Sequence, residues 1–119
     1  MTLRAALCVA LLLWPTVGPA YAEDREAAKH EARFGVDVAR RGLWREAIYR
    51  WERAVELDAS YAAALNNLGV AYEHEGQLEK ARQAYEKALA IEPNNFQIRQ
   101  NYDLFKEIND RAVAKPEKP

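Results

Sequence analysis

Residues 62–95 read AAALNNLGVAYEHEGQLEKARQAYEKALAIEPNN, and this stretch decides the fold. Apolar residues recur at helical spacing over 62–75 and again over 78–91, which predicts two amphipathic helices. Gly76 lies between them, where a glycine ends a helix easily because it tolerates a left-handed conformation. Pro93 ends the second segment, since the residue before a proline avoids helical angles. The stretch therefore predicts two helices joined by a tight turn.

The same pattern occurs once more, 34 residues earlier in the chain. Gly35 aligns with Gly69, and Gly42 aligns with Gly76. The other aligned pairs match small with small and large apolar with large apolar residues: Ala47 with Ala81, Trp51 with Tyr85, Ala54 with Ala88, Phe34 with Leu68, Val36 with Val70, Val38 with Tyr72, Trp44 with Leu78, Val55 with Leu89 and Leu57 with Ile91. So many matches in one register indicate an internal repeat.

Residues 62–95 resemble a tetratricopeptide repeat (TPR). The positions that carry the resemblance are Leu65, Leu68, Gly69, Tyr72, Gly76, Ala81, Tyr85, Ala88 and Pro93. The resemblance implies an all-α fold, a right-handed α-solenoid of two helix-turn-helix TPR units plus a C-terminal capping helix. Repeat 1 would cover 28–61, repeat 2 would cover 62–95, and the capping helix would cover 95–113. Residues 114–119 contain two prolines and no apolar periodicity, which predicts a disordered tail.

Glycines inside two of the expected helices predict close packing. Gly35 and Gly69 each cost about 1 kcal/mol relative to alanine in a helix. A close approach by another helix would explain them, and the natural partners are the small residues Ala47, Ala54, Ala81 and Ala88. Trp51 and Tyr85 would then fill the space between one helix pair and the next. In the capping helix, Ile98, Tyr102, Phe105 and Ile108 form one apolar stripe, with Leu104 at its edge.

The N-terminus predicts export. Arg4 precedes an apolar run over 5–14, which is too short for a permanent transmembrane helix. Ala20-Tyr21-Ala22 follows as a cleavage motif, so residues 1–22 are interpreted as a signal peptide of a periplasmic or secreted protein. An anchor retained without cleavage is the alternative. After cleavage we expect no stable membrane span, and no disulfide, because Cys8 is the only cysteine.

Catalytic, metal-binding and cofactor-binding residues are not expected. His30 and His74 lie at non-equivalent positions of different repeats, which does not favour a metal site. Ser60 precedes the third helix, where an N-cap role is the ordinary interpretation. Asn95 is expected to cap the last helix. The formal net charge of −1 provides no broad basic field for nucleic acid.

The resemblance implies that the first helix of each repeat lines a groove that binds a protein or peptide partner. The candidate groove residues are Lys29, Arg33, Val36, Asn66, Asn67, Val70, Gln97, Gln100, Asn101 and Leu104. The Lys and Asn clamp with which some relatives hold a terminal carboxylate is absent, because Ala32 and Val36 replace two of its members. The expected function is a non-catalytic protein–protein interaction module or assembly adaptor outside the cytoplasm. The alternative is a self-associating structural protein, which would form homo-oligomers through its terminal edges.

Overall fold

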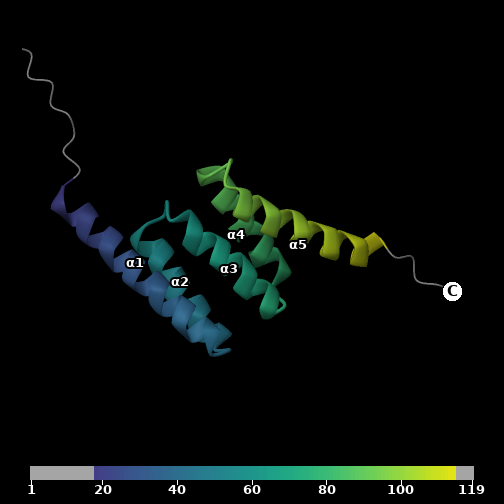
Figure 1. The fold of residues 1–119 in the computed structure, drawn as a ribbon, viewed down its shortest axis with the longest axis horizontal. Coiled ribbons are helices and arrows are strands. Elements are labelled where there is room, and N and C mark those ends of the chain that lie inside the picture. Colours follow the sequence, from purple (N-terminus) through teal and green to yellow (C-terminus); the bar gives the residue numbers. More distant parts are fainter. Residues whose placement is uncertain (1–17, 115–119) are drawn as a thin grey trace, which may run out of the picture.

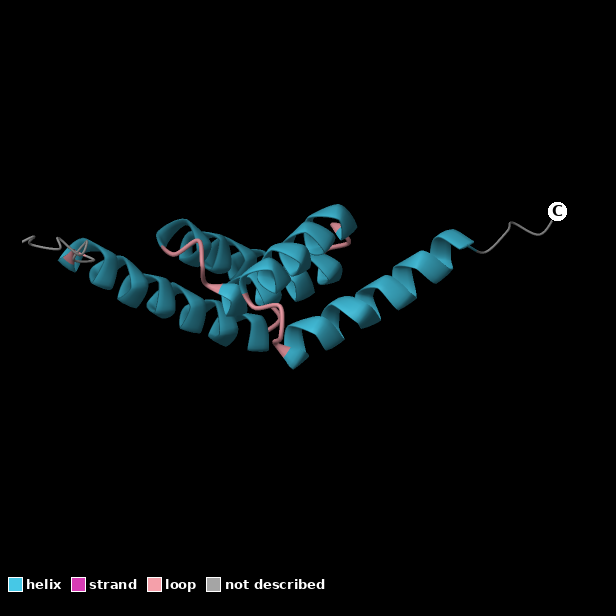
Figure 2. Ribbon diagram, turned by 90° about the horizontal axis from the view of Figure 1, so that it is seen from above, coloured by secondary structure: helices cyan, strands magenta, loops and turns pink. Residues whose placement is uncertain are grey.

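The computed structural model describes residues 18–114, and every regular element within them is an α-helix (Figure 1). The five helices are α1 (Pro19–Arg40), α2 (Trp44–Leu57), α3 (Ala62–His74), α4 (Leu78–Ile91) and α5 (Phe96–Ala114). Short loops join them, and α1 and α5 project beyond the three central helices (Figure 2). The expected all-α solenoid of two helix pairs and a closing helix is confirmed.

Local sequence explains where the pairs turn. The helix α4 is rich in Ala, Leu, Glu and Lys, all strong helix formers. Gly42 and Gly76 have φ angles of 76° and 71°, the left-handed region that favours glycine. At the second turn the N–H of Gln77 donates to the carbonyl of Tyr72 at 2.8 Å, so the end of α3 keeps a hydrogen-bond partner. Both glycines therefore end a helix as predicted.

The helix α1 begins earlier than the apolar pattern suggested. It starts at Pro19, and a proline suits the first position of a helix because its missing N–H has no partner there. Residues 20–27 are exposed, and Ala28 is the first buried side chain. This segment is helical without packing, which is why apolar periodicity did not reveal it. Residues 1–17 of the expected signal peptide and residues 115–119 of the expected tail lie outside the described part.

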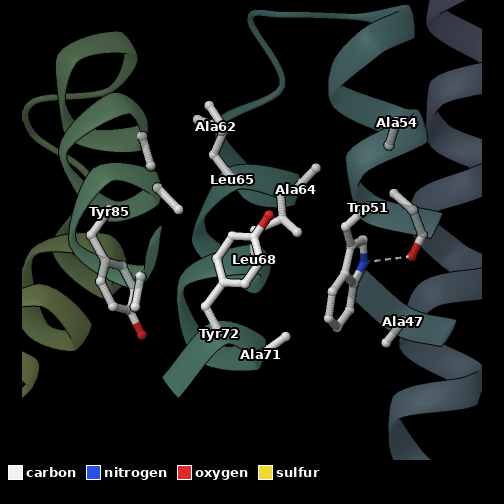
Figure 3. Close-up of a cluster of buried hydrophobic side chains, with 14 of the residues drawn as sticks. Ala47, Trp51, Ala54, Ala62, Ala64, Leu65, Leu68, Ala71, Tyr72 and Tyr85 are labelled. Atoms are coloured by element: carbon white, nitrogen blue, oxygen red, sulfur yellow. Dashed lines mark hydrogen bonds between the residues drawn. The ribbon is translucent and has the colours of Figure 1, made fainter. Parts of the chain in front are cut away.

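Each mid-helix glycine faces an aromatic ring. A Cβ atom at Gly69 would lie 2.5 Å from the Tyr85 ring, and one at Gly35 would lie 2.6 Å from Trp51. The close approach is confirmed, and the nearest atoms belong to an aromatic ring and not to one of the alanines expected from the sequence. The alanines at those positions are fully buried elsewhere in the core. The Trp51 indole N–H also donates to the Ala32 carbonyl at 3.1 Å, fixing α2 on α1 (Figure 3).

Tyrosine hydroxyls tie each later helix to the one before it. Tyr72 on α3 donates to Glu52 on α2 at 2.6 Å. Tyr85 on α4 donates to Glu73 on α3 at 2.5 Å. Burial, together with these hydrogen bonds, raises the pKa of Tyr72 and of Tyr85. Both hydroxyls therefore stay protonated in the folded protein when the pH passes the ordinary tyrosine value.

Stability should consequently fall in alkali. An unfolded tyrosine loses its proton near pH 10. The folded state holds the protons of Tyr72 and Tyr85 above that pH, so it binds more protons than the unfolded state. The free energy of unfolding should then be fully present below about pH 10 and decrease as the pH rises further. Urea unfolding across this range measures the effect. The variant Tyr72→Phe/Tyr85→Phe should show a shallower decrease, and an equal decrease would contradict the assignment.

The N-terminal end of the array is closed by one arginine. Arg50 lies 4.2 Å from the centroid of the Phe34 ring and pairs with Glu31 at 3.2 Å and Glu46 at 2.8 Å. Phe34 is 40% exposed, so Arg50 covers an apolar ring with a solvated cation. The Glu31 side chain is only 22% exposed. Its ion pair explains how a terminal repeat accommodates a carboxylate there.

The C-terminal end is closed by α5. Ile98 and Phe105 are buried as expected, but Ile108 is 58% exposed and does not share their environment. Asn109, the next residue, is partly buried, and Asp110 still bonds to Arg82 of α4. The covered side of α5 therefore continues through Asn109, and Ile108 lies outside it. Asn95 caps α5 as predicted, its side-chain oxygen accepting from the Ile98 N–H at 3.2 Å.

The N-cap expectation for Ser60 is wrong. The residue before α3 is Tyr61, and no side chain caps that helix. The Ser60 hydroxyl instead donates to Asp58 at 2.6 Å, and its backbone N–H donates to the same oxygen at 3.0 Å. Asp58 therefore organises this turn, in the way that aspartates bond to backbone two residues further on.

Candidate functional site

One side of the first helices carries a regular set of residues. Positions separated by 4, 3 and 4 residues share one face of a helix. In α1, α3 and α5 these positions align by the repeat into four rows, which we call the first-helix face: Lys29, Ala63 and Gln97; Arg33, Asn67 and Asn101; Val36, Val70 and Leu104; and Arg40, His74 and Ile108.

A pocket of about 270 Å³ opens on this face between α1, α2 and α3. Its lining residues are Val36, Ala39, Arg40, Trp44, Trp51, Asn67 and Val70. The pocket brings together three of the residues expected from the sequence, Val36, Asn67 and Val70. Its wall is mainly apolar, while Asn67 and Arg40 supply polar groups at its edge. Such a mixture can hold an apolar side chain and a hydrogen-bonding backbone together.

An aromatic stack borders the pocket. The Trp44 indole lies face to face with the His74 ring, with 3.9 Å between centroids and 11° between planes. Trp44 is half-buried and packs against the edge of the core. His74 itself is exposed. The stack joins the start of α2 to the end of α3 at the rim.

Asn66 does not lie on the groove surface as expected. Its side chain is 6% exposed, and its amide oxygen accepts from Asn101 at 3.1 Å. The pair joins α3 to α5, so Asn66 is part of the wall and Asn101 is already engaged. A helix position next to the groove turns inward here because α5 covers it. In the row of Arg33, Asn67 and Asn101, the amide that remains for a partner is that of Asn67, which is half-buried and lines the pocket.

The remaining expected residues are accessible. Lys29, Arg33, Gln97 and Gln100 are exposed, and Leu104 is 55% exposed. Lys29 also donates to Glu26 at 2.8 Å, a surface ion pair of small energetic value. Gln100 and Leu104 line a separate shallow hollow along α5. The structure thus gathers Val36, Asn67 and Val70 at one pocket and leaves the α5 residues apart from it.

Positive charge on the first-helix face is confined to α1. Lys29, Arg33 and Arg40 supply it, while the α3 and α5 rows hold apolar residues, amides and His74. The four rows contain no carboxylate. Glu26, one turn before Lys29 on the same side of α1, pairs with Lys29 at 2.8 Å, whereas Glu31 and Asp37 lie at other helical positions. One side of the pocket is therefore cationic and the other neutral.

Within residues 18–114, no three His, Cys, Asp or Glu side chains come together as they would to hold a metal ion. Of the helices described, none combines the length and apolar character needed to cross a membrane.

Comparison with known proteins gives the family. A tetratricopeptide repeat model matches residues 62–95, and a second TPR model matches residues 39–76. The chain is also 35% identical, over 85 residues and 71% of its length, to the chloroplastic tetratricopeptide repeat domain-containing protein PYG7 of Arabidopsis thaliana. The chain belongs to the tetratricopeptide repeat family. It spans 28% of the length of PYG7, so the similarity concerns the repeat region.

Solved structures agree with this TPR assignment. The TPR domain of Arabidopsis OM64 has a TM-score of 0.69 and 20% identity, over 74% of this chain and 73% of that one, which shows the fold alone. The MamA protein has a TM-score of 0.65 and 30% identity, over 77% of this chain and 52% of that one. The TPR fold supports a protein–protein interaction module, and a protein or peptide is the partner that such a module takes.

The sequence could have revealed the fourth row of this TPR face. The expected groove stopped at Val36, Val70 and Leu104, although the same register continues one turn further to Arg40, His74 and Ile108. Trp44 was missed for a different reason. Its repeat equivalent is Leu78, an aliphatic residue, so the repeat gives no sign of the stack that Trp44 forms with His74 of another helix.

Proposed function

We propose that this TPR protein is a non-catalytic adaptor that binds a peptide segment of a partner protein on its first-helix face, outside the cytoplasm. The observation that carries the proposal is the pocket between α1, α2 and α3, where Val36 and Val70 lie beside the Asn67 amide. Extended peptides need both an apolar socket and hydrogen-bonding groups for their backbone. The pocket supplies the two within one site.

Export rests on the N-terminal pattern and fits the packing. Arg4, the apolar run over 5–14 and the Ala20-Tyr21-Ala22 motif form a secretion signal. Residues 20–27 are exposed, so cleavage after Ala22 would remove no core side chain. Fractionation of cells producing the full chain with a C-terminal tag tests this. A tagged protein of unreduced size in the cytoplasm would contradict export.

Site-specific crosslinking tests where the partner binds. A photoreactive amino acid replaces Asn67 on the first-helix face or Gln83 on α4, in a separate hollow between α2, α3 and α4, and cells are irradiated. Both positions are solvent-accessible in helices, which makes Gln83 a matched control. The proposal expects a discrete partner crosslinked from position 67 and not from 83. Capture from position 83 alone would place the partner elsewhere.

The variant Asn67→Ala should weaken binding of that partner. Loss of one hydrogen bond costs about 0.5–1.5 kcal/mol, or roughly two- to tenfold in Kd. Asn101 is avoided because its amide holds Asn66. Asn94→Ala, at an exposed position between α4 and α5, is the control, and circular dichroism checks that both variants keep their helices. Equal Kd values for the Asn67→Ala and Asn94→Ala variants would exclude the amide from recognition.

The ends of the array favour a partner on the first-helix face over self-stacking. On α5 the positions equivalent to Leu65, Gly69 and Tyr72, which would meet a further helix, carry charges: Arg99, Asp103 and Lys106. At the other end Arg50 and its carboxylates cover Phe34. Two charged ends resist dehydration against another copy. Light scattering should give a monomer at all concentrations, and a rise in mass with concentration would support the structural alternative.

A further inference from the structure

We infer that the partner segment is an acidic peptide that inserts one large apolar side chain into the pocket between α1, α2 and α3. This inference rests on the proposed function and specifies its ligand. It follows from three properties of the described residues: the size and apolar wall of the pocket, the cations beside it, and the aromatic stack at its rim.

The pocket fits a single side chain. Its volume of about 270 Å³ lies below the roughly 300–1,000 Å³ of small-molecule sites. The wall is made by Val36, Val70, Ala39 and the two indole rings, with no carboxylate among the lining residues. An apolar group gains about 25 cal/mol for each Å² removed from water. An aromatic or long aliphatic side chain is the group that uses such a socket.

The surface beside the pocket selects negative charge. Arg33 lies one turn before Val36 on α1, and Arg40 lies one turn after it and lines the pocket. In the described part of the chain, neither arginine takes part in an ion pair, whereas Lys29 pairs with Glu26. Acidic residues before and after the inserted apolar side chain of the peptide could therefore each pair with one of these two guanidinium groups. No ion pair within the protein would have to break.

The aromatic stack at the rim of the pocket favours a flat or aliphatic group in the peptide, next to the side chain that enters the pocket. Trp44 and His74 stack at 3.9 Å, so they present the edge of an ordered aromatic pair beside Arg40. An ordered rim loses little conformational entropy on binding, which favours recognition of a defined side chain over adsorption of any anion.

The charge distribution favours a peptide over nucleic acid or a membrane. Both of those ligands require a broad basic surface, because many phosphates are neutralised at once. Here the cations lie on α1 alone, and the α3 and α5 rows have no lysine or arginine. The chain as a whole carries a formal charge of −1. A short acidic segment matches one cationic helix.

Fluorescence anisotropy of labelled synthetic peptides on the protein without its residues 1–22 and on the full chain tests the inference. The probe has blocked ends, which removes any terminal carboxylate, and the core Asp-Glu-Phe-Asp-Glu. Three comparison peptides replace Phe by Ala, replace the acidic residues by Lys, or replace them by Ser. We expect the acidic Phe peptide to bind and the Ala peptide to bind about tenfold or more weakly, given the burial of a large side chain. The Lys peptide should not bind.

Two double variants distinguish the effect of the positive charges beside the pocket from the effect of the net charge of the protein. Arg33→Gln/Arg40→Gln should weaken the acidic peptide about three- to tenfold, since exposed ion pairs contribute modestly. Arg53→Gln/Lys87→Gln removes the same charge from exposed positions of α2 and α4 and should leave Kd unchanged. Binding should also weaken from about 0.1 to about 1 M NaCl, as the Debye length falls from about 10 to about 3 Å.

Several outcomes would overturn the inference. They are equal binding of the Phe and Ala peptides, equal binding of the acidic and Lys peptides, and equal weakening by the two double variants. Arg33- and Arg40-dependent binding of duplex DNA or of phosphatidylserine vesicles at the affinity of the peptide would reassign the cations to phosphate. If crosslinking from position 67 still captures a partner in that case, the proposed function stands and only the ligand chemistry is wrong.

Discussion

Replacing Gly69 by leucine is expected to destabilise the protein by about 3 kcal/mol, the upper part of the range for overpacked cores. A Cβ atom at this position would lie within 2.5–2.7 Å of three atoms of the Tyr85 ring. The ring cannot move aside freely, because Tyr85 is fully buried and bonds to Glu73. A small domain is stable by only about 5–15 kcal/mol, so the melting temperature should fall by more than about 12 °C.

The control for this variant is Asp103→Leu. Asp103 is the repeat equivalent of Gly69 on α5, where it is exposed. The same leucine at the same register should therefore change stability little, because most surface substitutions stay within about 0.5 kcal/mol. Thermal unfolding followed by circular dichroism compares the two. An equal loss in both variants would mean that the glycine is not required by the ring.

Replacing Phe105 by alanine should cost about 3–5 kcal/mol, as expected for a buried aromatic residue. Phe105 is 1% exposed and packs on Tyr85, with ring centroids 5.6 Å apart. In repeat proteins each unit contacts only its neighbours. The damage should therefore concentrate in α5, which should lose amide hydrogen-exchange protection before the helix pair α1–α2 does.

Ile108→Ala is the matched control for the capping helix. Sequence periodicity placed Ile108 on the same stripe as Phe105, but its side chain is 58% exposed. The Ile108→Ala substitution should therefore change the free energy of unfolding by less than about 0.5 kcal/mol, like other surface substitutions. Hydrogen exchange measured by mass spectrometry reports both variants helix by helix. Uniform loss of protection in the Phe105→Ala variant would show that α5 is not an independent closing element.

Much of the fold could be predicted from the spacing of glycines and apolar residues along the sequence. The repeated glycines at Gly42 and Gly76 could be assigned to turns, and those at Gly35 and Gly69 to close contacts, because a glycine inside a helix needs a physical reason. The partners of the mid-helix glycines could not be predicted. Alanine and a flat ring both permit close approach, and the choice depends on which way α2 and α4 are rotated about their axes.

The candidate site was predicted in part. Repeat register placed Val36, Asn67 and Val70 correctly on one surface, since a rigid repeat converts sequence spacing into spatial rows. It could not place Asn66, whose burial depends on how α5 lies over α3. Nor could it give the Trp44–His74 stack, which joins residues 30 positions apart on different helices. Contacts between elements depend on tertiary geometry, which periodicity within one element does not contain.

The charged outer side of α5 has a consequence for how such a chain could lengthen during evolution. A duplicated unit appended after Ala114 would have to bury Arg99, Asp103 and Lys106, and removing such charges from water is costly. A unit inserted between α4 and α5 would instead inherit the flank of α4 that already accepts Phe105 and Ile98, and α5 would then close the longer molecule. Growth of this architecture is therefore expected by insertion ahead of the last helix and not by extension at the C-terminus.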